Sequence, residues 1–156
     1  MITAKDIMST DLITVHKDTD IKTLSKIFID KKINSVPVVD DEGKLIGIVS
    51  ETDLVYQDAS LHIPTVFSIF DSIFYLQSSK HFKEDLNKIT ASKVGDIMTG
   101  KVLSVKENES IYNIASIITE KKFYSIPVVG NNNELKGIVS RFDIIKSMMD
   151  DNKDTK

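Results

Sequence analysis

An internal repeat limits the possible folds of this chain more than any other feature of its sequence. Shifted by 90 residues, the sequence aligns with itself without a gap, and 18 of the 51 positions from 6 to 56 carry the same residue in both copies. The longest identical stretches pair Asp6–Met8 with Asp96–Met98, Pro37–Val39 with Pro127–Val129 and Gly47–Ser50 with Gly137–Ser140. Self-similarity at a fixed period indicates repeated structural units that pack on one another. We therefore expect two copies of one unit.

Each copy begins with the same two predicted elements. A short apolar segment, 12–15 or 102–105, predicts a first strand. We expect the next helix to be capped by Asp18 or Thr19 in the first copy and by Asn108 or Ser110 in the second. Apolar residues at helical spacing predict these two helices: Ile21, Leu24, Ile27 and Phe28, and Ile111, Ile114, Ile117 and Ile118.

Two strands and a second helix complete each copy. Residues 36–39 predict a buried strand, with Pro37 at a sheet edge or a strand start. A turn over residues 40–44 leads to a hairpin partner over 45–49, and a helix starts after Ser50. The unit is β-α-β-β-α, which places the chain in the α/β (α+β) class. Because neither unit alone can bury its sheet well, we expect the two to pack as a pseudo-two-fold pair.

The chain divides into four predicted segments. Residues 1–57 form the first repeat, 58–92 a helical insertion, 93–150 the second repeat and 151–156 a disordered polar tail. Pro64 suits the start of one insertion helix, and a second is expected over about 80–89. The first of these helices carries an apolar stripe, interpreted either as core or as a dimer contact: Val66, Phe67, Phe70, Ile73 and Phe74.

The composition excludes several classes of function. The net charge is −3 and the lysines are dispersed, so no direct nucleic-acid binding is expected. There is no cysteine, and the three histidines lack metal-ligand spacing, so no metal site is expected. No apolar segment approaches the ~20 residues of a membrane span, and the first ten residues lack a signal peptide's apolar stretch. We expect a cytoplasmic protein without a membrane anchor.

No phosphate-binding glycine loop or nucleophile motif is present, so we expect no enzyme and no catalytic residues.

Several spaced motifs resemble the CBS-domain family. They are DIMST, SVPVVD and GKLIGIVSETDL in the first copy and DIMTG, SIPVVG and LKGIVSRFDI in the second, over residues 4–57 and 94–149. The resemblance implies tandem CBS domains that bind an adenine nucleotide (AMP, ADP or ATP) or another adenosine derivative as a regulatory ligand, in clefts between the repeats. It also implies a homodimer. The insertion with HIPTVF looks like a feature of some bacterial CBS-pair proteins.

The family's nucleotide signature falls on Gly47–Asp53 and on Gly137–Asp143. By resemblance, the aspartates hold the ribose hydroxyls, and the serines contact ribose or phosphate. A carboxylate can accept two hydrogen bonds from a vicinal diol, and a helix start offers free N–H groups to a phosphate. The resemblance implies these ligand-binding residues: Thr14, Val15, Val36, Pro37, Ile48, Ser50, Asp53, Ser104, Val105, Ile126, Pro127, Ile138, Ser140, Arg141 and Asp143.

The same motif has a second interpretation. A serine three residues before an aspartate fits the capping box that starts a helix, and this is compatible with ligand contact. Arg141 follows the second serine and Glu51 the first, so the Asp143 site is expected to bind phosphorylated ligands more tightly. The strong phosphate binders of the family often carry His or Arg where this chain has Asn34-Ser35 and Tyr124-Ser125, which argues against tight binding of a triphosphate.

Three functions remain open at this point. The chain is a nucleotide-sensing module, a structural dimerisation module with no physiological ligand, or a ligand-gated regulator that acts through an unknown effector protein. Asp6 and Asp96, which precede Ile-Met in each copy, are predicted to be turn caps rather than catalytic acids.

Overall fold

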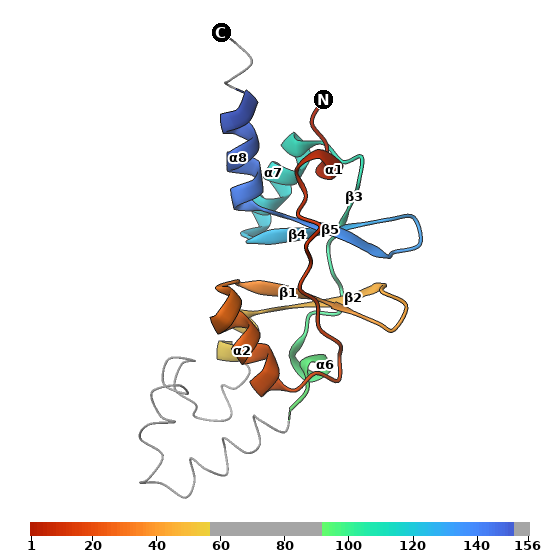
Figure 1. The fold of residues 1–156 in the computed structure, drawn as a ribbon, viewed down its shortest axis with the longest axis vertical. Coiled ribbons are helices and arrows are strands. Elements are labelled where there is room, and N and C mark those ends of the chain that lie inside the picture. Colours follow the sequence, from red (N-terminus) through yellow and green to blue (C-terminus); the bar gives the residue numbers. More distant parts are fainter. Residues whose placement is uncertain (57–91, 152–156) are drawn as a thin grey trace, which may run out of the picture.

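The computed structural model describes residues 1–56 and 92–151 (Figure 1). The helices predicted between residues 64 and 89 and the tail beyond residue 151 lie outside this range, as does the apolar stripe of the insertion. In the described part the two repeats are stacked on one another, with their hairpins facing each other across the middle of the molecule.

The first repeat contains α2 (Ile21–Lys31), β1 (Ser35–Val39), β2 (Leu45–Ser50) and α3 (Glu51–Tyr56). Strands β1 and β2 pair antiparallel, with Val36 opposite Val49. The turn between them contains Gly43 at a φ of 76°, a conformation that glycine adopts readily. The predicted hairpin is confirmed, and α2 matches the predicted apolar spacing.

The second repeat contains β3 (Val105–Lys106), α7 (Ile111–Lys121), β4 (Ser125–Val129), β5 (Leu135–Ser140) and α8 (Arg141–Asp151). β4 and β5 pair antiparallel in the same register as β1 and β2, and β3 pairs parallel to β4. In the first repeat, the equivalent of β3 is a single parallel bridge between Val15 and Val38. The predicted first strands over 12–15 and 102–105 are therefore wrong for most of their length. Residues 12–13 and 102–103 instead line clefts between the repeats.

The first long helix of each repeat starts at a side-chain cap. Asp20 accepts a hydrogen bond from the Thr23 backbone N–H at 2.8 Å, and Ser110 accepts one from the Asn113 N–H at 3.2 Å. Ser110 was among the predicted caps, whereas Asp18 and Thr19 were the wrong residues for α2. Asp20 and Ser110 are 90 residues apart, so the repeat itself identifies the matching cap. Both helices end at a lysine in the left-handed conformation, Lys32 in α2 and Lys122 in α7.

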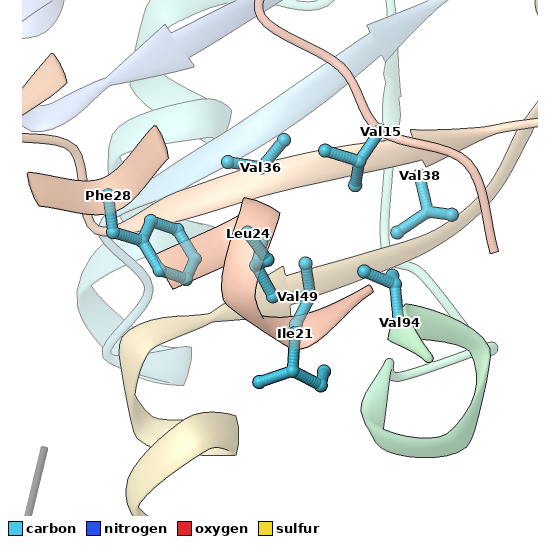
Figure 2. Close-up of a cluster of buried hydrophobic side chains, with 8 residues drawn as sticks. All are labelled: Val15, Ile21, Leu24, Phe28, Val36, Val38, Val49 and Val94. Carbon is cyan, nitrogen blue, oxygen red and sulfur yellow. The ribbon is translucent and has the colours of Figure 1, made fainter. Parts of the chain in front are cut away.

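Two short helices pack on the opposite repeat. α1 (Ala4–Ile7) lies beside α7 and α8, although it begins the first repeat, and α6 (Val94–Ile97) lies beside α2 (Figure 1). Ala4 is fully buried in the core of the second repeat. Val94 is fully buried in the core of the first, against Val15, Ile21 and Val49 (Figure 2). Each repeat is therefore completed by a segment of the other.

Backbone hydrogen bonds continue this exchange beyond the short helices. Ser9 and Ile138 exchange two backbone hydrogen bonds, of 2.9 and 3.0 Å, and Thr99 and Ile48 do the same. Asp6 and Asp96 accept hydrogen bonds from the backbone N–H groups of Thr3 and Lys93, so their predicted role as turn caps is confirmed.

The contacts between the repeats follow a pseudo-two-fold relation. The Leu45 N–H donates to the Asn133 carbonyl at 3.0 Å, and the Leu135 N–H donates to the Gly43 carbonyl at 3.1 Å. The two bonds are related by the shift of 90 residues. The predicted pseudo-two-fold packing is thus confirmed.

Candidate functional site

Two clefts lie between the repeats. The Arg141 cleft has a volume of about 610 Å³ and is lined from both repeats. The first repeat contributes Ser9, Asp11, Leu12, Ile13, Lys32, Ile33, Asn34, Ser35 and Pro37, and the second contributes Tyr124, Ser125, Ile138, Ser140, Arg141, Phe142 and Ile145.

The Asp53 cleft has a volume of about 400 Å³. Its residues from the first repeat are Ser35, Ile48, Ser50, Thr52 and Asp53, and those from the second are Thr99, Lys101, Val102, Leu103, Lys122, Phe123, Tyr124, Ser125 and Pro127. Both volumes fall within the roughly 300–1,000 Å³ of small-molecule sites. Each cleft therefore has room for a ligand the size of a nucleotide.

The clefts are related by the sequence repeat and share one wall. Ser35, Tyr124 and Ser125 line both of them. The Ser35 and Ser125 hydroxyls are hydrogen-bonded to each other at 3.0 Å, on the pseudo-two-fold axis that exchanges the two residues. A ligand in either cleft would lie close to this pair.

Both signature motifs form capping boxes. The Ser50 N–H donates to Asp53 Oδ2 at 2.7 Å, and the Ser140 N–H donates to Asp143 Oδ2 at 2.7 Å. The helix-capping interpretation of the motif is confirmed in both repeats. It leaves the second carboxylate oxygen, Oδ1, without a hydrogen bond from any described residue in either motif.

The two motifs differ in how the serine hydroxyl is used. The Ser140 hydroxyl donates to Asp143 Oδ2 at 2.6 Å and accepts from the Asp143 N–H at 3.2 Å, which closes the box in both directions. The Ser50 hydroxyl lies 3.1 Å from Asp53 Oδ2 and is bonded at 2.6 Å to the Thr52 hydroxyl. Asp53 lines its cleft, whereas Asp143 does not line the equivalent one.

The clefts combine predicted residues from different repeats. Pro37 lies with Ile138, Ser140 and Arg141 in the Arg141 cleft. Pro127 lies with Ile48, Ser50 and Asp53 in the Asp53 cleft. The exchange of N-terminal segments and the facing hairpins account for this crossed arrangement.

The other predicted ligand residues line neither cleft: Thr14, Val15, Val36, Ser104, Val105, Ile126 and Asp143. Four of them are buried among the apolar side chains of the two cores: Val15, Val36, Val105 and Ile126. Val36 and Ile126 each precede a proline that lines a cleft, and successive strand residues point to opposite faces. The strand thus directs the proline, not its neighbour, toward the cleft.

Sequence reasoning missed the segments that follow α1 and α6. Residues 11–13 line the Arg141 cleft, and residues 101–103 line the Asp53 cleft. At one matched position the charge is reversed, because Asp11 corresponds to Lys101. The gapless alignment displays this reversal, but only the crossing of the segments shows which cleft each residue enters.

Arg141 and Glu51, which were expected to make the two sites unequal, have different surroundings in the structure. Arg141 Nε donates to the Phe123 carbonyl at 2.8 Å, and its guanidinium carbon lies 5.1 Å from the centre of the Tyr124 ring. Glu51 accepts a hydrogen bond from the Asn34 amide at 3.3 Å and lines neither cleft. Glu51 therefore does not place a negative charge against a ligand in the Asp53 cleft.

The described residues also limit other kinds of site. Over residues 1–56 and 92–151, no helix is both long and apolar enough to cross a membrane. Within the same ranges, no three His, Cys, Asp or Glu side chains are grouped so that they could hold a metal ion.

Sequence comparisons relate the chain to known proteins over most of its length. The model of the CBS domain matches residues 4–59 and 94–150. A Methanocaldococcus jannaschii protein described as uncharacterized is 32% identical over 93% of this chain and 90% of its own length. The Arabidopsis thaliana chloroplastic protein CBSX2 is 27% identical over 93% of this chain, which spans 62% of that protein. An L-aspartate semialdehyde sulfurtransferase of M. jannaschii is 29% identical over 90% of this chain, which spans 22% of that enzyme.

Solved structures show the same fold. The crystal structure of CBSX2 in complex with AMP superposes with a TM-score of 0.75 at 26% identity, covering 97% of this chain and 99% of that one. The CBS domain pair of the protein MJ0100, in complex with 5′-methylthioadenosine and S-adenosyl-L-methionine, superposes with a TM-score of 0.68 at 26% identity, covering 97% and 98%. The predicted tandem CBS-pair fold is confirmed.

Proposed function

The chain belongs to the CBS-domain family, and we propose that it is a regulatory module that binds an adenine nucleotide between its repeats and signals through a partner protein or a dimer rearrangement. One observation carries this proposal. Ser50 and Asp53 of the signature motif line a cleft that also contains Lys101 and Lys122. A carboxylate that can accept from a ribose diol and two cations that can pair with a phosphate are the groups that a nucleotide requires.

The names of the structural relatives support an adenosine-based ligand. One is a complex with AMP, and another is a complex with 5′-methylthioadenosine and S-adenosyl-L-methionine. We propose AMP, ADP or ATP for this chain, because lysines line the cleft where Ser50 and Asp53 lie. Of these, AMP fits best, since no cation stands at Asn34 or Tyr124, where tight triphosphate binders of the family often carry one.

We propose that the module is not an enzyme. The residues that line the two clefts include neither histidine nor cysteine. One relative is named as a sulfurtransferase, but this chain spans only 22% of that enzyme. We propose instead that this chain transmits ligand binding to an effector protein in the cytoplasm.

A structural dimerisation module is the second candidate function. Helix α8 exposes large apolar side chains, with Phe142 82%, Ile145 56% and Met149 65% exposed. Exposed apolar groups gathered on one element are a frequent sign of a protein interface. We propose a homodimer under either function. A ligand-binding measurement therefore distinguishes the two candidate functions.

The test is a thermal-shift series with AMP, ADP, ATP, adenosine and S-adenosyl-L-methionine, with GMP as the control for the base. A ligand that binds only the folded protein stabilises it by about 2.7 kcal/mol at one hundred times its Kd. We expect an adenosine compound to raise Tm while GMP does not. If none of the adenosine compounds raises Tm at millimolar concentration, the structural module is the correct function.

A further inference from the structure

We propose that the two clefts are unequal and that only the Asp53 cleft binds a phosphorylated nucleoside, with Lys101 and Lys122 as its phosphate-recognising residues. This inference rests on the proposed function and assigns it to one cleft. It reverses the expectation from sequence that the Asp143 motif forms the tighter site.

The first support is the position of the two motif aspartates. Asp53 lines its cleft, and its hydrogen bond from the Ser50 hydroxyl is long, at 3.1 Å. That serine hydroxyl is also bonded, at 2.6 Å, to the hydroxyl of Thr52, which lines the same cleft. No described residue donates a hydrogen bond to Asp53 Oδ1, so within the cleft this atom is available to a ribose diol, with the Ser50 and Thr52 hydroxyls beside it.

In the other motif the aspartate forms the same helix cap, but it does not line the cleft. Asp143 and Ser140 exchange hydrogen bonds in both directions, and the hydroxyl bond is only 2.6 Å long. Asp143 does not line the Arg141 cleft, and Phe142 and Ile145 line it instead. An apolar side chain thus takes the place that Thr52 has in the Asp53 cleft, and no motif carboxylate faces a ligand.

The second support is the charge reversal at the segment that crosses from the other repeat. Lys101 lines the Asp53 cleft, and Asp11 occupies the matched position in the Arg141 cleft. Lys122 and Lys32 are also matched, so they do not distinguish the clefts. A carboxylate within a few ångströms of a phosphate opposes binding, whereas an ammonium group favours it. The crossing segment therefore selects for a phosphate in one cleft and against it in the other.

Arg141 does not offset this difference. Its Nε donates to the Phe123 carbonyl and its guanidinium lies over the Tyr124 ring, so it is held against the loop of its own repeat. A phosphate paired with the Nη groups of Arg141 would still face the negative charge of Asp11 in the same cleft.

Calorimetric titration of AMP into the full chain tests this assignment. We expect one AMP per chain. Asp53→Asn should weaken AMP binding about ten- to a hundredfold, since it removes a charge-assisted acceptor. Asp143→Asn is the matched control, because it disturbs the equivalent cap, and it should leave AMP affinity within about twofold. Melting curves of both variants verify that they are folded.

Charge reversal at the two matched positions, Lys101 and Asp11, tests the role of Lys101. Lys101→Asp should weaken AMP by about tenfold or more and change adenosine, which has no phosphate, much less. Asp11→Lys, the reverse change at the matched and equally exposed position, should leave the AMP affinity of the Asp53 cleft unchanged. Two equivalent AMP sites, or equal damage from Asp53→Asn and Asp143→Asn, would overturn the inference and leave the proposed function standing. If wild type binds none of AMP, ADP, ATP and adenosine, the proposed function itself is wrong.

Discussion

Replacement of Gly137 by alanine tests whether Met8 is part of the core of the second repeat. A Cβ added at Gly137 would lie 2.5 Å from Met8 Sδ, 2.8 Å from Met8 Cγ and 3.0 Å from Met8 Cβ. The clash involves the base of the methionine side chain as well as its tip. Rotation of the side chain alone cannot relieve it, so the segment after α1 has to move away from β5.

Two opposing effects determine the size of the change. Replacing glycine by alanine in a compatible backbone stabilises a protein by about 0.4–1 kcal/mol, since the unfolded chain becomes less flexible. Overpacking a filled core costs about 1–3 kcal/mol. Overpacking outweighs the gain here, so we expect Gly137→Ala to lose about 1–2 kcal/mol of unfolding free energy.

Urea unfolding measures this loss, with Gly100→Ala as the matched control. A Cβ at Gly100 meets no atom within 4 Å, so that variant should be as stable as wild type or slightly more stable. Met8→Ala should reduce the cost of Gly137→Ala, with a coupling energy of at least about 0.5 kcal/mol in the double-mutant cycle. If Gly137→Ala is as stable as Gly100→Ala, or if the two changes are additive, Met8 does not pack on β5 as the structure places it.

Further predictions concern caps, the shared wall and assembly. Ser110→Ala should lower the unfolding free energy by about 1 kcal/mol in urea, whereas Asn108→Ala should not change it. Hydrogen bonds from the Thr23 N–H and hydroxyl lower the pKa of Asp20 below its usual 3.8. The stabilisation from this carboxylate is therefore present above about pH 3.8 and lost as the pH falls through its folded pKa, so the stability gap between wild type and Asp20→Ala should narrow in acid unfolding curves. Ser35→Ala and Ser125→Ala should each cost about 0.5–1.5 kcal/mol and the double variant less than their sum, because each single change leaves one hydroxyl without its partner; additive losses would contradict the bond between them. Sedimentation equilibrium at micromolar concentration should give twice the 17.5 kDa chain mass, and a purely monomeric species would exclude the homodimer.

Much of the fold was predictable because the repeat and the apolar spacing carry independent information. The spacing of Ile21, Leu24 and Phe28 identifies the buried face of α2, and all three are buried. The cap of that helix was missed because Asp18, Thr19 and Asp20 are all reasonable caps by residue type. Comparison with Ser110 in the second copy would have selected Asp20.

The crossing of α1 and α6 could not be predicted from the same patterns. A gapless repeat shows that two similar units exist, but the sequence of Ala4–Ile7 is equally compatible with packing on either hairpin. The structure distinguishes them by the burial of Ala4 beside Val128 and Val139 and by the backbone hydrogen bonds between Ser9 and Ile138. This crossing brings residues 9–13 and 99–103 to the opposite repeat. The residues that line each cleft could therefore not be predicted from the sequence patterns either.

The clefts show why nearly identical motifs need not form equivalent sites. Gly47–Ser50 and Gly137–Ser140 have the same sequence, and both motifs end in an aspartate three residues later. From the motifs alone, the only charge difference is between Glu51 and Arg141, and neither of those side chains determines the charge facing the Asp53 carboxylate. The cations of the Asp53 cleft are Lys101 and Lys122, and of these only Lys101 has a counterpart of opposite charge, Asp11, in the other cleft. We infer that specificity at the Asp53 motif depends on a segment far away in the sequence, since Lys101 lies 48 residues after Asp53. Each repeat places its first segment, residues 9–13 or 99–103, in the cleft of the other repeat's motif. A single substitution in one of these segments therefore changes one cleft and leaves both motifs unaltered.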